Sequence, residues 1–145
     1  MSVKETRFNI RLRKEFKARG IRIDRIESHA LAAGIPDDAF LDTKRKKSGW
    51  IEIKEEETIP FKIKYRPKQP LWLQSYSNDG GICCTIIHIQ ETDVAMVIPG
   101  EYTLDADRNL PALMKEDVIK FVDLKNPDCW NLLINISIRW PKNAK

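Results

Sequence analysis

The sequence predicts an α/β fold in which a mixed β-sheet is flanked by helices. Three observations lead to this prediction: an amphipathic helix near the N-terminus, a group of strand-like runs after it, and a later helix followed by a continuous apolar strand. The chain has 145 residues, a usual length for one domain, and 42% of them are hydrophobic. A chain of this kind can bury a core.

The first half of the chain is predicted to contain one helix and three strands. Apolar side chains recur every four positions at Phe8, Leu12 and Phe16, which places them on one face of a helix that Gly20 ends. Alternation of apolar and polar residues then indicates strands. The expected elements are a helix over 3–19, a strand over 21–26, a loop over 28–35, and strands over 37–41 and 50–53 joined by a basic turn over 44–49.

The second half begins with a charged excursion and then returns to regular structure. Pro70 suits the first turn of a helix, and the uninterrupted apolar run over 82–87 is typical of a strand covered on both faces. Asp128 can cap a last helix. We expect an excursion over 55–68, a helix over 70–77, strands over 82–87 and 94–98, a last helix carrying Trp130, Leu133 and Ile136, and core positions for Trp72 and Trp130.

Charge is distributed unevenly along the chain. Residues 1–70 carry 18 Lys and Arg against 11 Asp and Glu, a net +7, whereas residues 71–145 carry 7 against 10, a net −3. A basic half suits a polyanionic partner, although a solvated lysine-rich surface explains it equally well. The sequence has neither an apolar run long enough for a membrane helix nor an N-terminus like a signal peptide, so we expect a cytoplasmic protein, in the host cell if it is viral.

The segments around Asp37 and Glu52 contain a pattern that suggests chemistry. Side chains alternate along a strand, so Glu52 and Lys54 point the same way, and a hairpin through the basic turn brings Asp37 beside them. Carboxylate oxygens are the ligands that Mg²⁺ and Mn²⁺ prefer. The alternative is that Asp37 belongs to an ordinary turn after Pro36 and that Glu52 and Lys54 form a surface ion pair.

This pattern resembles the PD-(D/E)XK nuclease superfamily, and most closely its VRR-NUC branch, the phage relatives of that branch and the Holliday-junction resolvases. The resemblance covers about residues 3–90 and implies a restriction-endonuclease-like core. Its pieces follow the family's order: Glu5 on the first helix, Gly34-Ile35-Pro36-Asp37, Trp50-Ile51-Glu52-Ile53-Lys54, Gln69 with Trp72, and Gly80-Gly81 before the strand at Ile82.

The resemblance assigns roles to these positions. It implies that Asp37, Glu52 and the backbone carbonyl of Ile53 bind one or two Mg²⁺ (or Mn²⁺) ions and that Lys54 is the catalytic lysine. It also implies that the glutamate of the first helix joins the metal site, directly or through water. Metal ions of this kind can polarise a phosphate and lower the pKa of a bound water.

The third acidic residue is left open between Glu5 and Glu27. Glu5 precedes the stripe of Phe8, Leu12 and Phe16 at helical spacing, where a carboxylate needs a partner, although an anion in the first turn of a helix is also favourable by itself. We expect the Glu5 carboxylate to lie within ~6 Å of those of Asp37 and Glu52. Glu27, just after the first strand, is the rival.

Further candidates are polar residues outside the carboxylate pair. Gln69 matches a glutamine that related nucleases place near the lysine and the scissile phosphate, and Ser28 matches a serine that some resolvases have before the aspartate. A helix-start residue and a loop serine are the simpler explanations. The basic turn is expected to lie beside the proposed site and to bind a DNA backbone through Lys44, Arg45, Lys46 and Lys47. The alternative is that these side chains are only solvated.

These expectations give one nuclease domain over 1–145, with a core over about 3–90 and an extension over 91–145 for dimerisation or capping. The expected activity is metal-dependent hydrolysis of DNA, preferably of branched DNA such as four-way junctions, by a homodimer. The alternatives are a nuclease of the same superfamily that ignores branches and a nucleic-acid-binding protein without catalysis.

Overall fold

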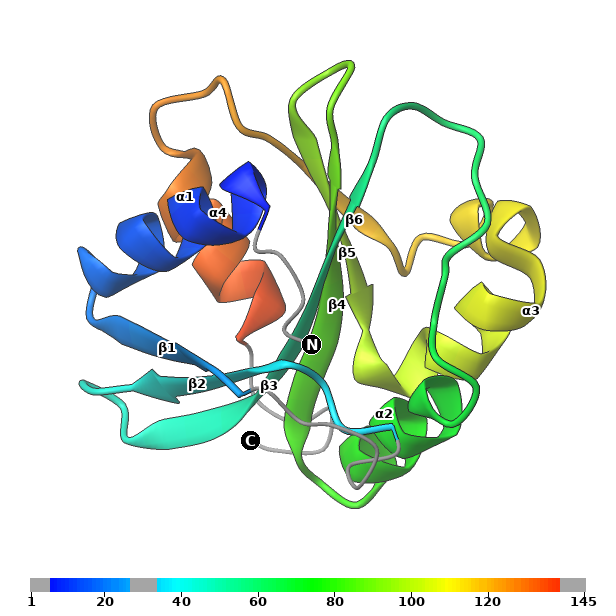
Figure 1. Cartoon of the computed structure of the whole chain (residues 1–145), viewed down its shortest axis with the longest axis horizontal. Helices are drawn as coiled ribbons and strands as arrows, with labels where there is room; N and C mark the ends of the chain where they lie inside the picture. Colours follow the sequence, from blue (N-terminus) through cyan, green and yellow to red (C-terminus); the bar gives the residue numbers. More distant parts are fainter. Residues whose placement is uncertain (1–5, 27–33, 139–145) are drawn as a thin grey trace.

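The computed structural model describes residues 6–26 and 34–138, which form a six-stranded sheet with helices on both faces (Figure 1). The strands lie side by side in chain order, and every neighbouring pair is antiparallel except β3 and β4, which run parallel. The predicted mixed α/β fold is therefore confirmed. The elements are α1 (Arg7–Lys17), β1 (Ile21–Arg25), β2 (Asp38–Asp42), β3 (Lys47–Glu56), α2 (Gln69–Asn78), β4 (Ile82–Ile89), β5 (Val94–Pro99), the short 3₁₀ helix η1 (Gly100–Tyr102), α3 (Thr103–Met114), β6 (Lys120–Asp123) and α4 (Cys129–Ser137).

Two hydrophobic clusters bury the sheet, one on each face. On one face α1 and α4 pack together, and the rings of Phe16 and Trp130 meet edge to face at 6.4 Å. On the other face α3 and the segment 57–68 cover the strands. Ile86 belongs to the first cluster and Ile87 to the second, and both are fully buried. The continuous apolar run of β4 is thus covered on both sides, as predicted. None of the described helices has the length and apolar character needed to cross a membrane.

The first helix is shorter than the predicted 3–19. It begins at Arg7 because Thr6 is its N-cap, where the hydroxyl accepts a hydrogen bond of 3.1 Å from the backbone of Asn9. It ends at Lys17, and residues 18–20 form a turn. The stripe of Phe8, Leu12 and Phe16 is buried as expected. Residues 3–5 lie outside the described part of the chain.

The hairpin between β2 and β3 has a tighter turn than expected. The Asp42 carboxylate accepts hydrogen bonds of 3.0 Å from the backbone of both Lys44 and Arg45, and Lys46 adopts a positive φ of 57°. These contacts reverse the chain within residues 43–46. Lys47, Ser48 and Gly49 consequently belong to β3 rather than to the turn.

The C-terminal part contains elements that the sequence analysis did not find. Helix α3 is kinked at Asn109 and contains Pro111, so its apolar positions do not follow one helical period. Strand β6 has only four residues and lies at the edge of the sheet. The last helix begins where expected, but the Asp128 side chain makes no capping hydrogen bond. Residues 94–99 and 120–123 continue the sheet, and α4 contributes to the same cluster as α1.

Asp38 is a buried carboxylate on the α1 side of the sheet. It pairs in register with Ile51, whose side chain lies in that core, so it faces away from Asp37 as expected. Its side chain is 1% exposed and accepts one long hydrogen bond, 3.5 Å from the Asn9 amide. Burial raises the pKa of the Asp38 carboxyl to about 7, although Arg25 opposes the shift. The residue is therefore a titrating group inside the core.

Asp38→Asn should make folding less sensitive to pH. As the pH rises from about 4 to 7, the unfolded carboxyl loses its proton while the folded one keeps it, so wild-type stability falls across this window. The amide of the variant has no proton to lose, and the variant should gain roughly 1–4 kcal/mol relative to wild type between pH 4 and pH 8. Urea unfolding at several pH values measures this difference. A difference that stays constant with pH would contradict the shifted pKa.

Candidate active site

Strand β3 presents Glu52 and Lys54 on the face opposite α1. Ile51 and Ile53 pack on the α1 side, so the alternation of the strand turns Glu52 and Lys54 the other way. The Glu52 side chain is buried, and its Oε2 lies 3.3 Å from the Lys54 ammonium. The pair that the sequence predicts is formed, and it is largely screened from water.

Asp37 joins this pair from the residue before β2. Its backbone N–H donates to Glu52 Oε1 at 3.4 Å, because β2 and β3 pair in the register that sets Asp38 opposite Ile51. The hairpin thus brings together Asp37, Glu52 and Lys54, as the sequence analysis expected. Asp37 remains partly exposed while Glu52 is buried.

Arg66 is the neighbour that the sequence analysis missed. Its Nη1 lies 3.5 Å from Asp37 Oδ1, and its Nη2 donates to the Ile35 carbonyl. In the sequence this arginine stands immediately before Pro67 and three positions before Gln69, and neither position indicates a contact with Asp37. The excursion therefore supplies a cation to the loop that carries Asp37.

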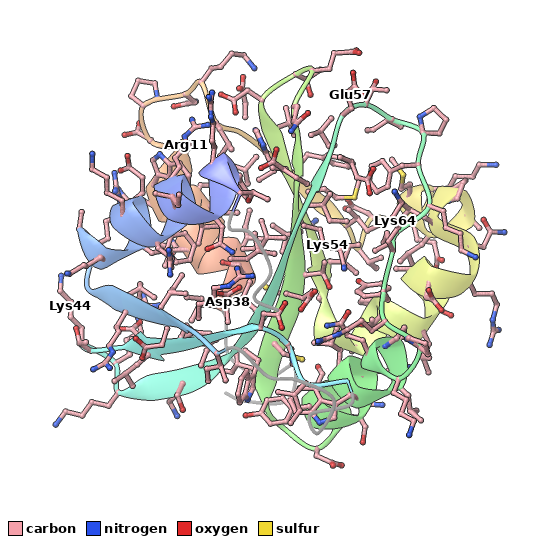
Figure 2. All side chains as sticks on the ribbon, viewed as in Figure 1. Arg11, Asp38, Lys44, Lys54, Glu57 and Lys64 are labelled. Atoms are coloured by element: carbon pink, nitrogen blue, oxygen red, sulfur yellow. The ribbon has the colours of Figure 1, made fainter. Side chains whose placement is uncertain are left out.

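The same segment fixes the position of Lys54. The Lys54 ammonium donates to the Lys64 carbonyl at 2.7 Å and lies 5.3 Å from the centre of the Tyr65 ring. Figure 2 shows Lys54 on β3 and Lys64 on the segment 57–68, which faces that strand. The Tyr65 hydroxyl shares a 2.7 Å hydrogen bond with Thr85 of β4, and burial raises the pKa of Tyr65, so this tyrosine is neutral. Lys54 is held on three sides, by Glu52, Lys64 and Tyr65.

The charges around Glu52 oppose one another. Burial raises the pKa of the Glu52 carboxyl, and the Lys54 ammonium lowers it. The nearby Asp37 carboxylate raises this pKa further, whereas the Arg66 guanidinium lowers it. Two carboxylates in one sheltered place need positive charge beside them. In the described structure Lys54 and Arg66 provide it.

Gln69 lies at the start of α2 and is completely buried. Its Oε1 accepts a 3.3 Å hydrogen bond from the backbone of Arg66, which in turn reaches Asp37. Its Nε2 is buried and has no hydrogen-bond partner among the described residues. A buried amide donor without a partner is uncommon in proteins. Gln69 is thus joined to the Asp37 loop through Arg66.

The basic turn does not lie beside these residues. Asp42 pairs with Lys47 at one end of the hairpin, whereas Asp38 pairs with Ile51 at the other. Four residue steps along β2 separate the two ends, about 13 Å at 3.3–3.4 Å per residue. Figure 2 shows Lys44 far from Asp38 and Lys54. The expectation that the turn adjoins the site was wrong, because β3 is longer at its start than predicted.

The remaining predicted site residues divide into two groups. The Ile53 side chain packs against the α1-side core, and the metal-binding role expected for its backbone carbonyl stays a prediction. The positions that lie outside the described residues are Glu5, Glu27 and Ser28. The expected distance from Glu5 to Asp37 and Glu52 therefore stays a prediction, and the helical stripe itself begins only with α1 at Arg7.

The donor set fits a hard divalent cation. Within residues 6–26 and 34–138 no three His, Cys, Asp or Glu side chains form a ready metal cluster. Mg²⁺, however, is usually bound by one or two carboxylates together with waters and substrate phosphates. The Asp37 carboxylate lies near the buried Glu52 carboxyl and raises its pKa, which is the unfavourable charge that a bound cation would relieve.

Trp72 lies beside the site rather than in the core. Trp130 is buried as predicted, but Trp72 is only half-buried, stacks on Tyr76 at 4.9 Å and meets Trp50 edge to face at 6.0 Å. Gly34, at the start of the Asp37 loop, packs against it: a Cβ on Gly34 would lie 2.8 Å from Trp72 Cβ and 2.7 Å from the Lys68 carbonyl. The loop therefore needs glycine at this point.

Comparison with known proteins finds similarity in structure alone. No protein-family model and no curated protein sequence matches the chain. Among solved structures, the fold is similar to that of Hjc, a Holliday junction resolvase from the archaeal hyperthermophile Archaeoglobus fulgidus. The TM-score is 0.52 at 15% sequence identity, over 88% of this chain and 93% of that one. The chain thus has a fold similar to that of this resolvase.

Gly34→Ala should destabilise the protein more than Gly80→Ala. Both glycines have a positive φ, 90° and 101°, so alanine is strained at each by about 1–2 kcal/mol. A Cβ at Gly80 meets nothing within 4 Å, whereas a Cβ at Gly34 meets α2. The Gly34 variant should therefore lose roughly a further 1–3 kcal/mol in urea unfolding. Equal losses would mean that the Asp37 loop does not press against α2.

Proposed function

We propose that this protein is a metal-dependent DNA endonuclease whose active site contains Asp37, Glu52 and Lys54. The observation that carries the proposal is the convergence of these three side chains on one face of β3 within a resolvase-like fold. Two carboxylates and a lysine at such a hairpin are also the motif of the PD-(D/E)XK superfamily that the sequence resembles, including its VRR-NUC and phage branches.

Asp37 and Glu52 would hold Mg²⁺ or Mn²⁺, with the Ile53 carbonyl as a further ligand. When bound, such an ion polarises the phosphate and lowers the pKa of an attacking water. Burial of Glu52 keeps competing water away from this carboxylate. Glu5 or Glu27 would complete the acidic set.

The cationic and amide side chains would bind the phosphate. The Lys54 ammonium is already oriented by Glu52 and the Lys64 carbonyl, so it can face a phosphate oxygen or hold the attacking water without searching many rotamers. The buried Gln69 Nε2, which has no hydrogen-bond partner among the described residues, could donate a hydrogen bond to the phosphate. The planar guanidinium of Arg66 suits a phosphate when it leaves Asp37.

The preferred substrate in this proposal is branched DNA, such as a four-way junction, cut by a homodimer that supplies two symmetric sites. The support is the similarity of the fold to Hjc, which is described as a Holliday junction resolvase. In this proposal the domain spans 1–145, and residues 91–145 serve dimerisation or capping as well as completing the sheet. Cleavage of junctions but not of linear duplexes would support this preference, and equal cleavage of both would favour a nuclease that ignores branches.

Asp37→Asn and Glu52→Gln should each lower Mg²⁺-dependent cleavage of a four-way junction by at least about 100-fold, because each removes a charge that the metal needs. Asp38→Asn is the matched control: it makes the same chemical change one residue away, on the opposite face of the sheet. We expect the control to cleave at the wild-type rate. Single-turnover rates with Mg²⁺ and with EDTA, on variants shown to be folded, measure the effect.

Two results would overturn the assignment. Wild-type cleavage by a folded Asp37→Asn, Glu52→Gln double variant would place the active site elsewhere. DNA binding by the wild-type protein without cleavage of any branched or linear substrate in Mg²⁺ or Mn²⁺ would leave a nucleic-acid-binding protein.

A further inference from the structure

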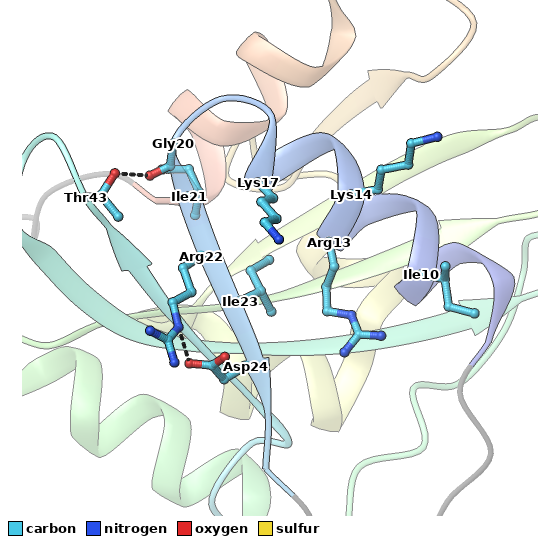
Figure 3. A pocket seen from close by; sticks show the side chains of 10 residues that line it. All are labelled: Ile10, Arg13, Lys14, Lys17, Gly20, Ile21, Arg22, Ile23, Asp24 and Thr43. Carbon is cyan, nitrogen blue, oxygen red and sulfur yellow. Dashed lines mark hydrogen bonds and ion pairs between the residues drawn. The ribbon is translucent and has the colours of Figure 1, made fainter.

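A positively charged surface, separate from the candidate active site, lies between α1 and β1. It is a groove of about 680 Å³, and its walls come from the outer side of α1, the edge strand β1 and the start of the hairpin turn (Figure 3). The polar residues that line it are Arg13, Lys14, Lys17, Arg22, Asp24 and Thr43. The carboxylates of the candidate active site are absent from this lining.

The groove is basic because of how α1 packs. Phe8, Leu12 and Phe16 turn one face of the helix to the core, which leaves the positions of Lys14 and Lys17 on the outer face. Both lysines are exposed. Figure 3 shows the Lys17 and Arg13 side chains projecting from α1 and ending near Ile23 of β1.

The positive charges of the groove outnumber its one carboxylate. Asp24 accepts a 2.8 Å hydrogen bond from Arg22 on the same strand, so these two opposite charges offset each other. The other charged residues of the described lining are all basic, namely Arg13, Lys14 and Lys17, and the lining therefore has a net charge of +3 on a sheet edge. A surface of this kind attracts a polyanion.

The groove is continuous with the basic turn. The Thr43 hydroxyl donates to the Gly20 carbonyl at 2.8 Å, which ties the turn to the end of α1. A Cβ on Gly20 would lie 3.5 Å from Lys44 Cε, so the Lys44 side chain runs along the same end of the groove. Lys44, which lies away from the candidate active site, thus extends one basic strip that begins on α1.

We propose that this strip, formed by Arg13, Lys14, Lys17 and Lys44, binds the phosphodiester backbone of duplex DNA. The inference rests on the proposed function for the identity of the nucleic acid, but binding here needs neither metal nor cleavage. Arginine and lysine side chains that neutralise phosphates release counterions, which makes such binding strong and dependent on salt. The strip meets the hairpin at the end opposite Asp37 and Glu52, so the protein would hold DNA at a place separate from the bond that it cuts.

Lys14→Glu with Lys17→Glu tests this inference. The matched control is Arg108→Glu with Lys115→Glu, which makes the same change of charge at exposed positions on or just after α3, on the other face of the sheet. Binding of a 20-base-pair duplex is measured by fluorescence anisotropy in EDTA between 50 and 200 mM salt. We expect the groove variant to bind at least about 10-fold more weakly at 100 mM salt and its salt slope to fall by about 2. The control should change binding less than about threefold.

A second variant, Lys14→Gln with Lys17→Gln, separates the loss of positive charge from a folding defect. Glutamate near the C-terminal end of α1 interacts unfavourably with the helix dipole and could destabilise the helix, whereas glutamine is neutral. This neutral variant should weaken binding in the same direction with unchanged thermal unfolding. Three results would each overturn the inference. The groove variants could bind DNA as the wild type does, the groove variant and the control could lose the same affinity, or polyglutamate could compete as effectively as DNA. Reduced binding by the groove variant alongside a wild-type protein that cuts nothing would uphold it and refute the nuclease proposal.

Discussion

The alternation of side chains along β3 is the constraint on which both the core and the candidate active site depend. Ile51 and Ile53 pack in the cluster beneath α1, so Glu52 and Lys54 must point to the other face of the sheet. The strand cannot slip by one residue without turning Lys54 into the core beneath α1 and Ile51 out of it. Gly49 fixes the strand further, since a Cβ there would lie 2.1 Å from the Ile82 carbonyl of β4. The apolar residues of the strand therefore determine where its carboxylate points.

Much of this arrangement could be predicted because it depends on short-range patterns. Four-residue spacing marks α1, and strand alternation with a basic turn marks the hairpin that joins Asp37 to Glu52. The elements that were missed lack such a pattern: Pro111 and the kink at Asn109 break the period of α3, and β6 is a four-residue edge strand. Arg66 could not be assigned from the sequence, because its contact with Asp37 depends on the path of a segment without regular secondary structure.

That segment, residues 57–68, contacts the site through side chains and through main-chain carbonyls on either side of the contact. Lys54 binds the Lys64 carbonyl, and Arg66 binds both the Ile35 carbonyl and the Asp37 side chain. Carbonyl oxygens are present whatever the side chain, so a sequence pattern gives no sign of them. The same holds for the distance between the basic turn and the site, which is set by the length of β3 and became evident only from the pairing of the strands.

The contact between Arg66 and Asp37 has a consequence for how the site would take up a metal ion. Asp37 Oδ1 already has a positive partner, and the guanidinium is also tied to the Ile35 carbonyl. Metal uptake would thus be an exchange of one cation for another rather than the filling of a vacant position. An exchange of this kind favours the metal most when a phosphate arrives to receive the displaced guanidinium, so that ion and substrate would strengthen each other's binding.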